Sequence, residues 1–182
     1  ALYYNTTGPY NTAMGSSALY FNTTGGNNTA TGNRALHENS TGQDNTATGF
    51  TALLRNTTGG SNTATGTEAL KLNTGGNNNI AMGRQALMNN TIGSGNLALG
   101  VGAGINQTVG SNNMYLSHLG VAGESGTIRF GTPGTQTRAF LAGVAGVPVS
   151  GSVVQVDANG QLGITPSSRR YKEAIENMGT AS

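Results

Sequence analysis

The sequence predicts an all-β protein, a parallel β-solenoid built from 17-residue coils, and three observations support this. First, the composition excludes an ordinary globular core: 30 of 182 residues are Gly, 5% are aromatic and 9% are charged. Second, Ala, Leu and Gly recur in fixed columns. Third, Asn recurs with an unbroken 17-residue period, at Asn11, Asn28, Asn45, Asn62, Asn79, Asn96 and Asn113.

The columns of small and medium apolar residues define the expected interior. One Ala column begins at Ala13, a second at Ala18, and a Leu column begins at Leu19. A coil of this length suits two short strands of about five residues joined by tight corners. Two Gly columns, beginning at Gly8 and Gly15, are expected at corners that need a positive φ angle. We expect the solenoid to cover residues 1–112, with further coils upstream.

Stacked coils place like residues above one another, about 4.8 Å apart. The Asn11 column then becomes a structural ladder of side-chain amides, and a second Asn column begins at Asn5. These amides are expected to bond to each other and to backbone groups at the corners. The Thr column that begins at Thr6 adds β-branched residues suited to strands.

Four columns vary from coil to coil and hold nearly all the charges of the repeats, so we expect them to face solvent or a partner. Aromatic residues gather in these columns in the early coils: Tyr3, Tyr4, Tyr20, Phe21 and Phe50. They are candidates for binding a host-surface glycan or receptor. Packing at a subunit interface is the alternative interpretation.

The period is lost after Asn113. Residues 113–166 form short alternating runs such as TIRFG and SVVQV, with a turn signal at DANG. These runs have little to bury within one chain, so we expect a β-rich stalk in which three chains intertwine. Over 167–182, Tyr171, Ile175 and Met178 are spaced as on one helix face, which predicts a short C-terminal helix.

Several classes of function are excluded by composition. The net charge is +2 and no basic stripe is present, which argues against nucleic acid as a partner. No apolar run approaches the roughly 20 residues of a membrane-spanning helix. The chain has no Cys, and Asp44 is the only Asp before residue 113, which argues against metal sites. We expect no cofactor, and no enzyme activity in the repeats.

The repeat pattern NTAxGxxALxxNTTG resembles the head repeats of trimeric autotransporter adhesins. The resemblance covers residues 1–112, although the period here is longer than in the adhesins. It implies a left-handed parallel β-roll and assembly as a homotrimer. It also implies a location outside the cell, on a cell surface or on a virion.

A second resemblance lies at GTPGTQTRAF, VVQVDANGQLG and SSRRYKEAI, which look like the stalk and junction before the intramolecular chaperone domain of phage tail spikes and endosialidases. Residues 167–182 would then be the helical start of a truncated chaperone domain. In that family a Ser and a Lys five positions later form a self-cleaving dyad, which places Ser167 and Lys172 as candidates. Ser168 and Ala174 replace the family's Asp and Asn, so we expect an uncut junction.

The sequence therefore favours a structural and adhesive fibre protein that assembles as a homotrimer and presents its repeats for surface attachment. One alternative is an ice-binding Thr ladder, although the Thr12 column gives way to Ile80 and Leu97. A second alternative is an autoprocessing chaperone fragment that acts through Ser167 and Lys172.

Overall fold

The computed structural model of the chain describes residues 1–139, 154–158 and 160–164. The chain divides into two compact units, Ala1–Arg138 and Ala139–Ser182. The regular elements in the described residues are all β-strands. The predicted C-terminal helix, over 167–182, lies outside the described residues.

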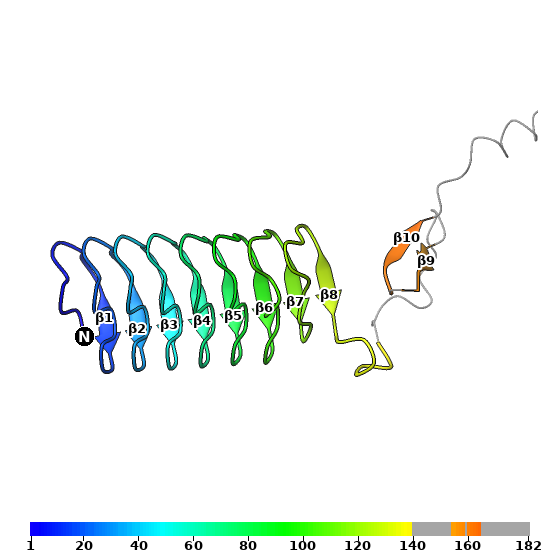
Figure 1. Ribbon diagram of the computed structural model, residues 1–182, viewed down its shortest axis with the longest axis horizontal. Helices are drawn as coiled ribbons and strands as arrows, with labels where there is room; N and C mark the ends of the chain where they lie inside the picture. The colour runs from blue at the N-terminus through cyan, green and yellow to red at the C-terminus, as the bar shows by residue number, and fades with distance from the viewer. Residues whose placement is uncertain (140–153, 159, 165–182) are drawn as a thin grey trace, which may run out of the picture. The chain divides into compact units, whose positions relative to one another are not determined.

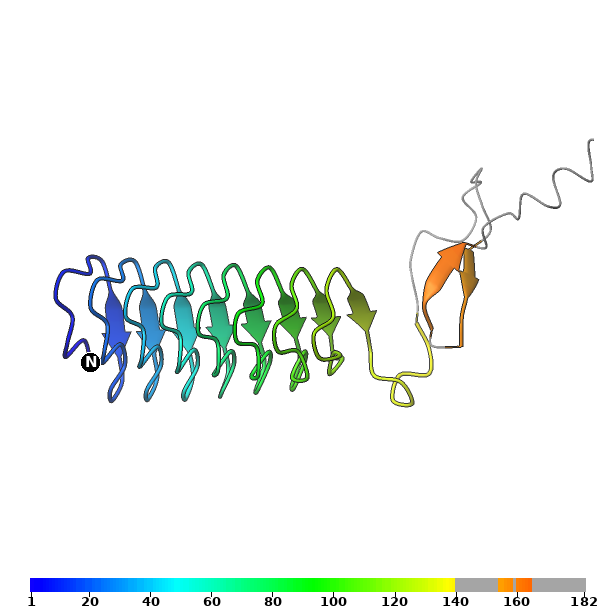
Figure 2. The ribbon, with the colours of Figure 1, turned by 45° about the horizontal axis from the view of Figure 1, so that its top comes forward.

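The first unit is a parallel β-solenoid, as the 17-residue period predicts. Each coil contributes one three-residue strand, and the strands pair in sequence order into an eight-stranded parallel sheet along one side of the stack (Figures 1 and 2). Thr12 pairs with Thr29, and Thr29 pairs with Thr46, which confirms the coil length. The strands are β1 (Thr12–Met14), β2 (Thr29–Thr31), β3 (Thr46–Thr48), β4 (Thr63–Thr65), β5 (Ile80–Met82), β6 (Leu97–Leu99), β7 (Met114–Leu116) and β8 (Ile128–Phe130).

The solenoid continues past the boundary expected at residue 112. β7 occupies the same columns as β6, with Tyr115 opposite Ala98, and β8 pairs with β7. Met114 pairs with Ile128, so the last coil is shorter than the coils before it. The period therefore disappears from the sequence one coil before the strand pairing ends.

The prediction of two strands per coil is wrong, and the Ala-Leu pair explains why. Ala18 and Leu19 are consecutive and both are fully buried. Successive side chains of a strand point to opposite faces, so a strand cannot bury both. Leu19 instead adopts a φ of 48°, and its column mates Leu36, Leu53, Leu70 and Leu87 adopt 49–50°. Coils still bond here, since the Leu19 N–H donates to the Ala35 carbonyl at 3.0 Å.

The two Gly columns serve different purposes. Gly15 and its column mates adopt φ angles between 122° and 136°, as expected at a corner. Gly25, in the Gly8 column, has no positive φ. A Cβ atom there would overlap the Gly42 carbonyl oxygen of the next coil. Gly is needed in this column because the backbones approach so closely.

Two ladders of Asn side chains run through the interior beside the Ala and Leu columns. In the Asn11 column, Asn45 donates from its backbone N–H and from Nδ2 to the Asn28 Oδ1, at 3.0 and 3.1 Å. In the Asn5 column, Asn56 Nδ2 donates to Asn39 Oδ1 at 2.8 Å and to the Gly59 carbonyl at 2.8 Å. From the second coil on these Asn side chains are buried. Each amide therefore connects one coil to the next inside the protein.

The described part of the second unit is a short antiparallel hairpin. β9 (Val154–Val156) pairs with β10 (Leu162–Ile164), with Val156 opposite Leu162. The turn lies at the DANG motif, where the Gly160 N–H donates to the Asp157 carbonyl at 3.0 Å. Val156 and Leu162 are each 63% exposed.

The buried ladders predict a difference between interior and surface Asn residues. We expect Asn56→Ala to lower the free energy of unfolding by about 1–3 kcal/mol, because buried partners in two coils lose a hydrogen bond. Asn33, exposed on the surface, is the matched control, and Asn33→Ala should stay within about 0.5 kcal/mol of wild type. Denaturant titrations measure both, and equal losses would contradict a stabilising role for the ladder.

Candidate functional site

Four of the five aromatic binding candidates lie together on the surface of the first coils. Tyr3 and Tyr20 stack with ring centroids 5.1 Å apart, and Tyr4 and Phe21 stack at 5.3 Å. The two rows touch edge to face, with Tyr20 and Phe21 at 4.9 Å. His37 extends the first row and stacks on Tyr20 at 5.5 Å. We call these five residues the aromatic cluster.

The rings of the aromatic cluster are covered to different extents. Tyr20 has a stacked ring on each face, from Tyr3 and from His37, whereas Tyr3 remains 69% exposed. Burial, and then the Arg34 charge, lower the pKa of His37, which favours the neutral imidazole in the stack. Phe50 lies in another column, is 52% exposed and makes no ring contact with the cluster.

The outward face of the sheet divides into two halves of different chemistry. Over β1–β4 it carries Thr in both outward columns, apart from Met14. We call this region the Thr half, and its residues are Thr12, Thr29, Thr31, Thr46, Thr48, Thr63 and Thr65. Over β5–β8 the same columns are wholly apolar. This apolar half consists of Ile80, Met82, Leu97, Leu99, Met114, Leu116, Ile128 and Phe130.

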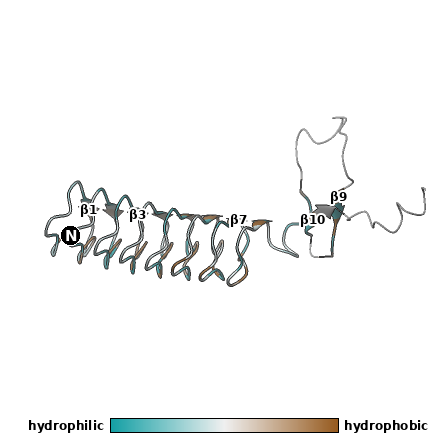
Figure 3. Ribbon diagram, turned by 90° about the horizontal axis from the view of Figure 1, so that it is seen from above, coloured by the Kyte–Doolittle hydropathy of each residue, from teal (hydrophilic) through white to brown (hydrophobic). Residues whose placement is uncertain are grey.

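The apolar half is open to solvent in the single chain. Phe130 is 69% exposed, Ile128 61% and Met82 47%. In Figure 3 the strands turn toward brown in the direction of β7. The two halves of this face could have been predicted from the sequence, because alternate residues of each TAT, IAM and LAL motif lie on one side of a strand.

The Thr column that begins at Thr6 lies elsewhere and has a structural role. The Thr23 hydroxyl donates to the Ser40 carbonyl of the next coil at 2.8 Å, and the Thr57 hydroxyl donates to Thr74 in the same way at 2.9 Å. These hydroxyls are used to join coils. The seven hydroxyls of the Thr half make no such bond within the described chain.

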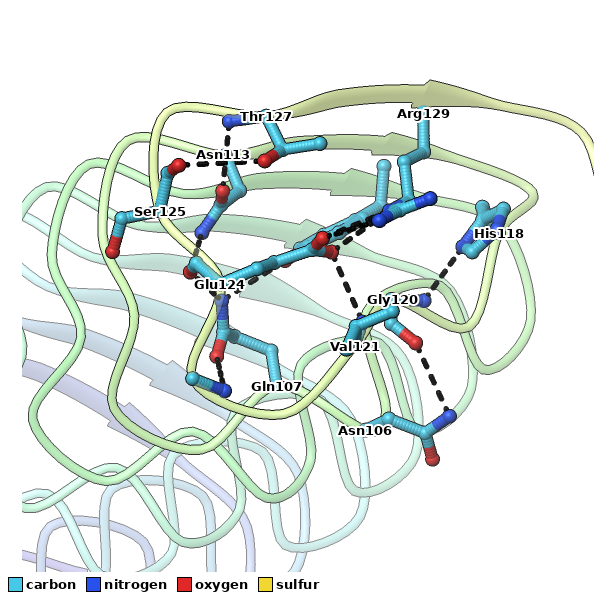
Figure 4. A network of polar contacts seen from close by, with 12 residues as sticks. Asn106, Gln107, Asn113, His118, Gly120, Val121, Glu124, Ser125, Thr127 and Arg129 are labelled. Atoms are coloured by element: carbon cyan, nitrogen blue, oxygen red, sulfur yellow. Dashed lines mark hydrogen bonds and ion pairs between the residues drawn. The ribbon is translucent and has the colours of Figure 1, made fainter. Parts of the chain in front are cut away.

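The C-terminal end of the solenoid is closed by a polar network (Figure 4). Tyr115 takes the place of an interior Ala and is fully buried. Gly104 takes the place of the neighbouring Leu, and a Cβ atom on it would lie 2.7 Å from the Tyr115 ring. The ring therefore fills the volume that Leu fills in other coils. Gln107 replaces the ladder Asn and donates from Nε2 to the Tyr115 hydroxyl at 2.9 Å.

An ion pair between Arg129 and Glu124 covers the buried Tyr115 side chain at the end of the solenoid. The Arg129 Nη2 lies 2.7 Å from the Glu124 Oε2, and Arg129 occupies the interior column directly after Tyr115. The Glu124 carboxylate also accepts the Val121 N–H at 3.0 Å. We call Gln107, Tyr115, Glu124 and Arg129 the C-terminal cap.

The surroundings of the cap shift the pKa values of its acids. Burial would raise the pKa of Glu124, but hydrogen bonds from Arg129 and from the Val121 N–H outweigh it, and the pKa lies below its usual value. Burial, followed by the Glu124 charge, raises the pKa of Tyr115. The cap therefore holds an ionised carboxylate against a neutral phenol. With its donors and acceptors bonded to one another, it serves to close the solenoid.

The remaining predictions concern self-cleavage, metal binding and membrane-spanning segments. Ser167 and Lys172, the candidates for self-cleavage, lie outside the described residues. Within the described ranges, no three His, Cys, Asp or Glu side chains gather as a metal site would require. No helix in that part of the chain is long and apolar enough to span a membrane.

Comparison with family models, curated proteins and solved structures gave no match to this chain. The fold defines the class of protein, a β-solenoid repeat protein. The surfaces described above supply the basis for a proposal about what it does.

The Glu124 pKa predicts loss of stability in acid. Because the folded-state pKa lies below the unfolded value of about 4.3, the ionised carboxylate stabilises the protein above that pH. The stabilisation is lost as the pH falls through the folded-state pKa. We expect the melting temperature to drop below about pH 4, and to drop less steeply in Glu124→Gln.

The matched control is Glu68→Gln, because Glu68 also has a lowered pKa, caused first by its hydrogen bond from Lys71. That pair lies on the surface of a central coil, where ion pairs contribute little. Melting curves by circular dichroism between pH 3 and 7 compare the variants. Acid profiles that coincide for wild type and Glu124→Gln would contradict the role of the cap.

Proposed function

We propose that this chain is part of a structural, adhesive fibre on a cell surface, extracellular appendage or virion tail. In this proposal it assembles as a homotrimer of left-handed β-rolls. An intertwined stalk and a helical junction follow the solenoid. The repeats are presented to a host-surface glycan or receptor.

The observation that carries the proposal is a constant interior beneath a changing surface. From the second coil to the fifth, the same Asn, Ala and Leu residues are buried in each coil. Outside, one column reads Tyr20, His37, Leu54, Lys71 and Met88. Such a frame holds different side chains at fixed spacing along a rod, which suits a display scaffold. Thr51 and Leu54 are exceptions within the variable columns, since both are buried.

Assembly is supported by apolar surface in both units. The apolar half of the sheet is uncovered in the single chain, and so are Val154, Val156 and Leu162 of the hairpin. A lone two-stranded hairpin is marginal in water, so partners from other chains would stabilise it. Three intertwined copies supply those partners.

The aromatic cluster is the proposed attachment surface, and it leads to a test. We expect Tyr20→Ala to lower binding to host cells or to a glycan array, because Tyr20 packs against Tyr3, Tyr4, Phe21 and His37. Lys71→Ala, in the same column three coils away, should bind as wild type does. Light scattering on each protein should give the mass of three chains. Unchanged binding by Tyr20→Ala would contradict the attachment surface, and a single-chain mass would contradict the trimer.

Ice binding is a second candidate, because the Thr half favours it. In the TAT strands β2–β4, paired Thr residues share one outward face in register, with Ala inside. None of their hydroxyls is used within the described chain, so all are free to order water. The array stops after four strands, and we therefore prefer the fibre.

Thermal hysteresis separates the two candidates. An ice-binding chain would depress the freezing point below the melting point, and Thr48→Tyr would abolish the effect by interrupting the flat array. Phe50→Tyr, which alters a side chain in a different column, is the control. For the fibre we expect no hysteresis in any of the three proteins.

A further inference from the structure

We propose that the apolar half of the sheet is the surface through which copies of this chain contact one another, in parallel and in register around a common axis. The inference rests on the proposed assembly. It adds the residues that make the contact and the direction in which the copies run.

The apolar half is larger than scattered surface residues would explain. Eight large apolar side chains occupy two adjacent columns on four consecutive strands, and five of them are at least 41% exposed. Continuous apolar patches of this kind mark interaction sites on soluble proteins. Neither column contains a charged residue, so identical copies meet without repulsion.

The spacing of the rows identifies the occupant as another copy of this chain. Successive strands of the sheet place equivalent side chains about 4.8 Å apart. A partner must repeat with the same spacing to fit between the rows at all four levels. A second solenoid of the same sequence does so by construction.

The division of the sheet into two halves determines the relative direction of the contacting copies. In a parallel, in-register arrangement, each apolar half faces an apolar half and each Thr half faces a Thr half. Copies running in opposite directions and fully overlapped would instead place Leu99 and Leu116 against Thr rows. Cyclic symmetry with parallel chains is therefore the arrangement that matches the surface. It leaves a dry contact at β5–β8 and a water-filled one at β1–β4, where the hydroxyls are free.

Two substitutions in the same outward column test the contact in the full chain. Leu99→Asp introduces a charge into the apolar half, and Thr48→Asp introduces the same charge into the Thr half. We expect Leu99→Asp to raise the concentration needed for assembly by at least about tenfold, because every copy buries a carboxylate. Thr48→Asp should assemble nearly as wild type does. Sedimentation gives the mass, and circular dichroism confirms that both variants are folded.

Cross-linking provides a second measurement that leaves the fold almost unchanged. The chain has no Cys, so Met82→Cys, Leu116→Cys and the surface control Arg55→Cys each carry one thiol. With a short thiol cross-linker, the parallel arrangement joins copies at both Met82→Cys and Leu116→Cys, and not at Arg55→Cys. If the apolar halves overlapped in an antiparallel orientation, the Met82→Cys thiols of two copies would lie at opposite ends of the contact and would not be joined.

The outcomes distinguish the interface from the assembly. A wild-type chain that sediments as a monomer would contradict the proposed assembly itself. A wild-type oligomer that Leu99→Asp leaves intact, and that cross-links no better through Met82→Cys than through Arg55→Cys, would overturn this interface alone. Dissociation by Leu99→Asp together with cross-links at both levels would establish it.

Discussion

The thinness of each coil is the constraint on which the rest of the structure depends. The interior has room for Ala, Leu and amide groups, so backbone carbonyls reach into it and need buried partners. Both Asn ladders meet this need: the Gly42 carbonyl accepts Nδ2 of Asn28 and Nδ2 of Asn39, each at 2.9 Å. Partly satisfied polar networks are costly in a protein interior, so every coil must superpose on the next.

This strict superposition separates two kinds of position. Interior columns tolerate almost no change, because a new group at one level meets the same column one coil away. Most positions of the exterior columns lie on the surface and differ from coil to coil, as Tyr20 and Lys71 do in one column. The ends are the exception, since the last coil has no successor to complete its bonds. There Gln107 turns its amide to Tyr115 and to the Glu124 carbonyl, and Asn90 Oδ1 is left without a donor.

The sequence was sufficient to predict the coil length and the residues that point inward, because both follow directly from columns of identical residues. It did not reveal the positive φ of Leu19, since a branched apolar residue is rarely found there and only tertiary packing imposes it. The adjacent buried Ala18 was the available clue. The shortened last coil and the C-terminal cap occur once each and follow no repeat, so no sequence pattern predicts them. Tyr115 and Gly104, as substitutions within their columns, were visible but gain meaning only when seen in contact.

The C-terminal cap has a consequence for the length of the solenoid. Its residues contact the adjacent coils, so the closure does not depend on the total number of coils. Gain or loss of a whole 17-residue unit would therefore change the rod by about 4.8 Å and leave the closure intact. An insertion of any other length would move the ladder Asn residues of that coil out of alignment with those of the adjacent coil. In evolution the length of the solenoid can therefore change only by whole coils, in steps of about 4.8 Å.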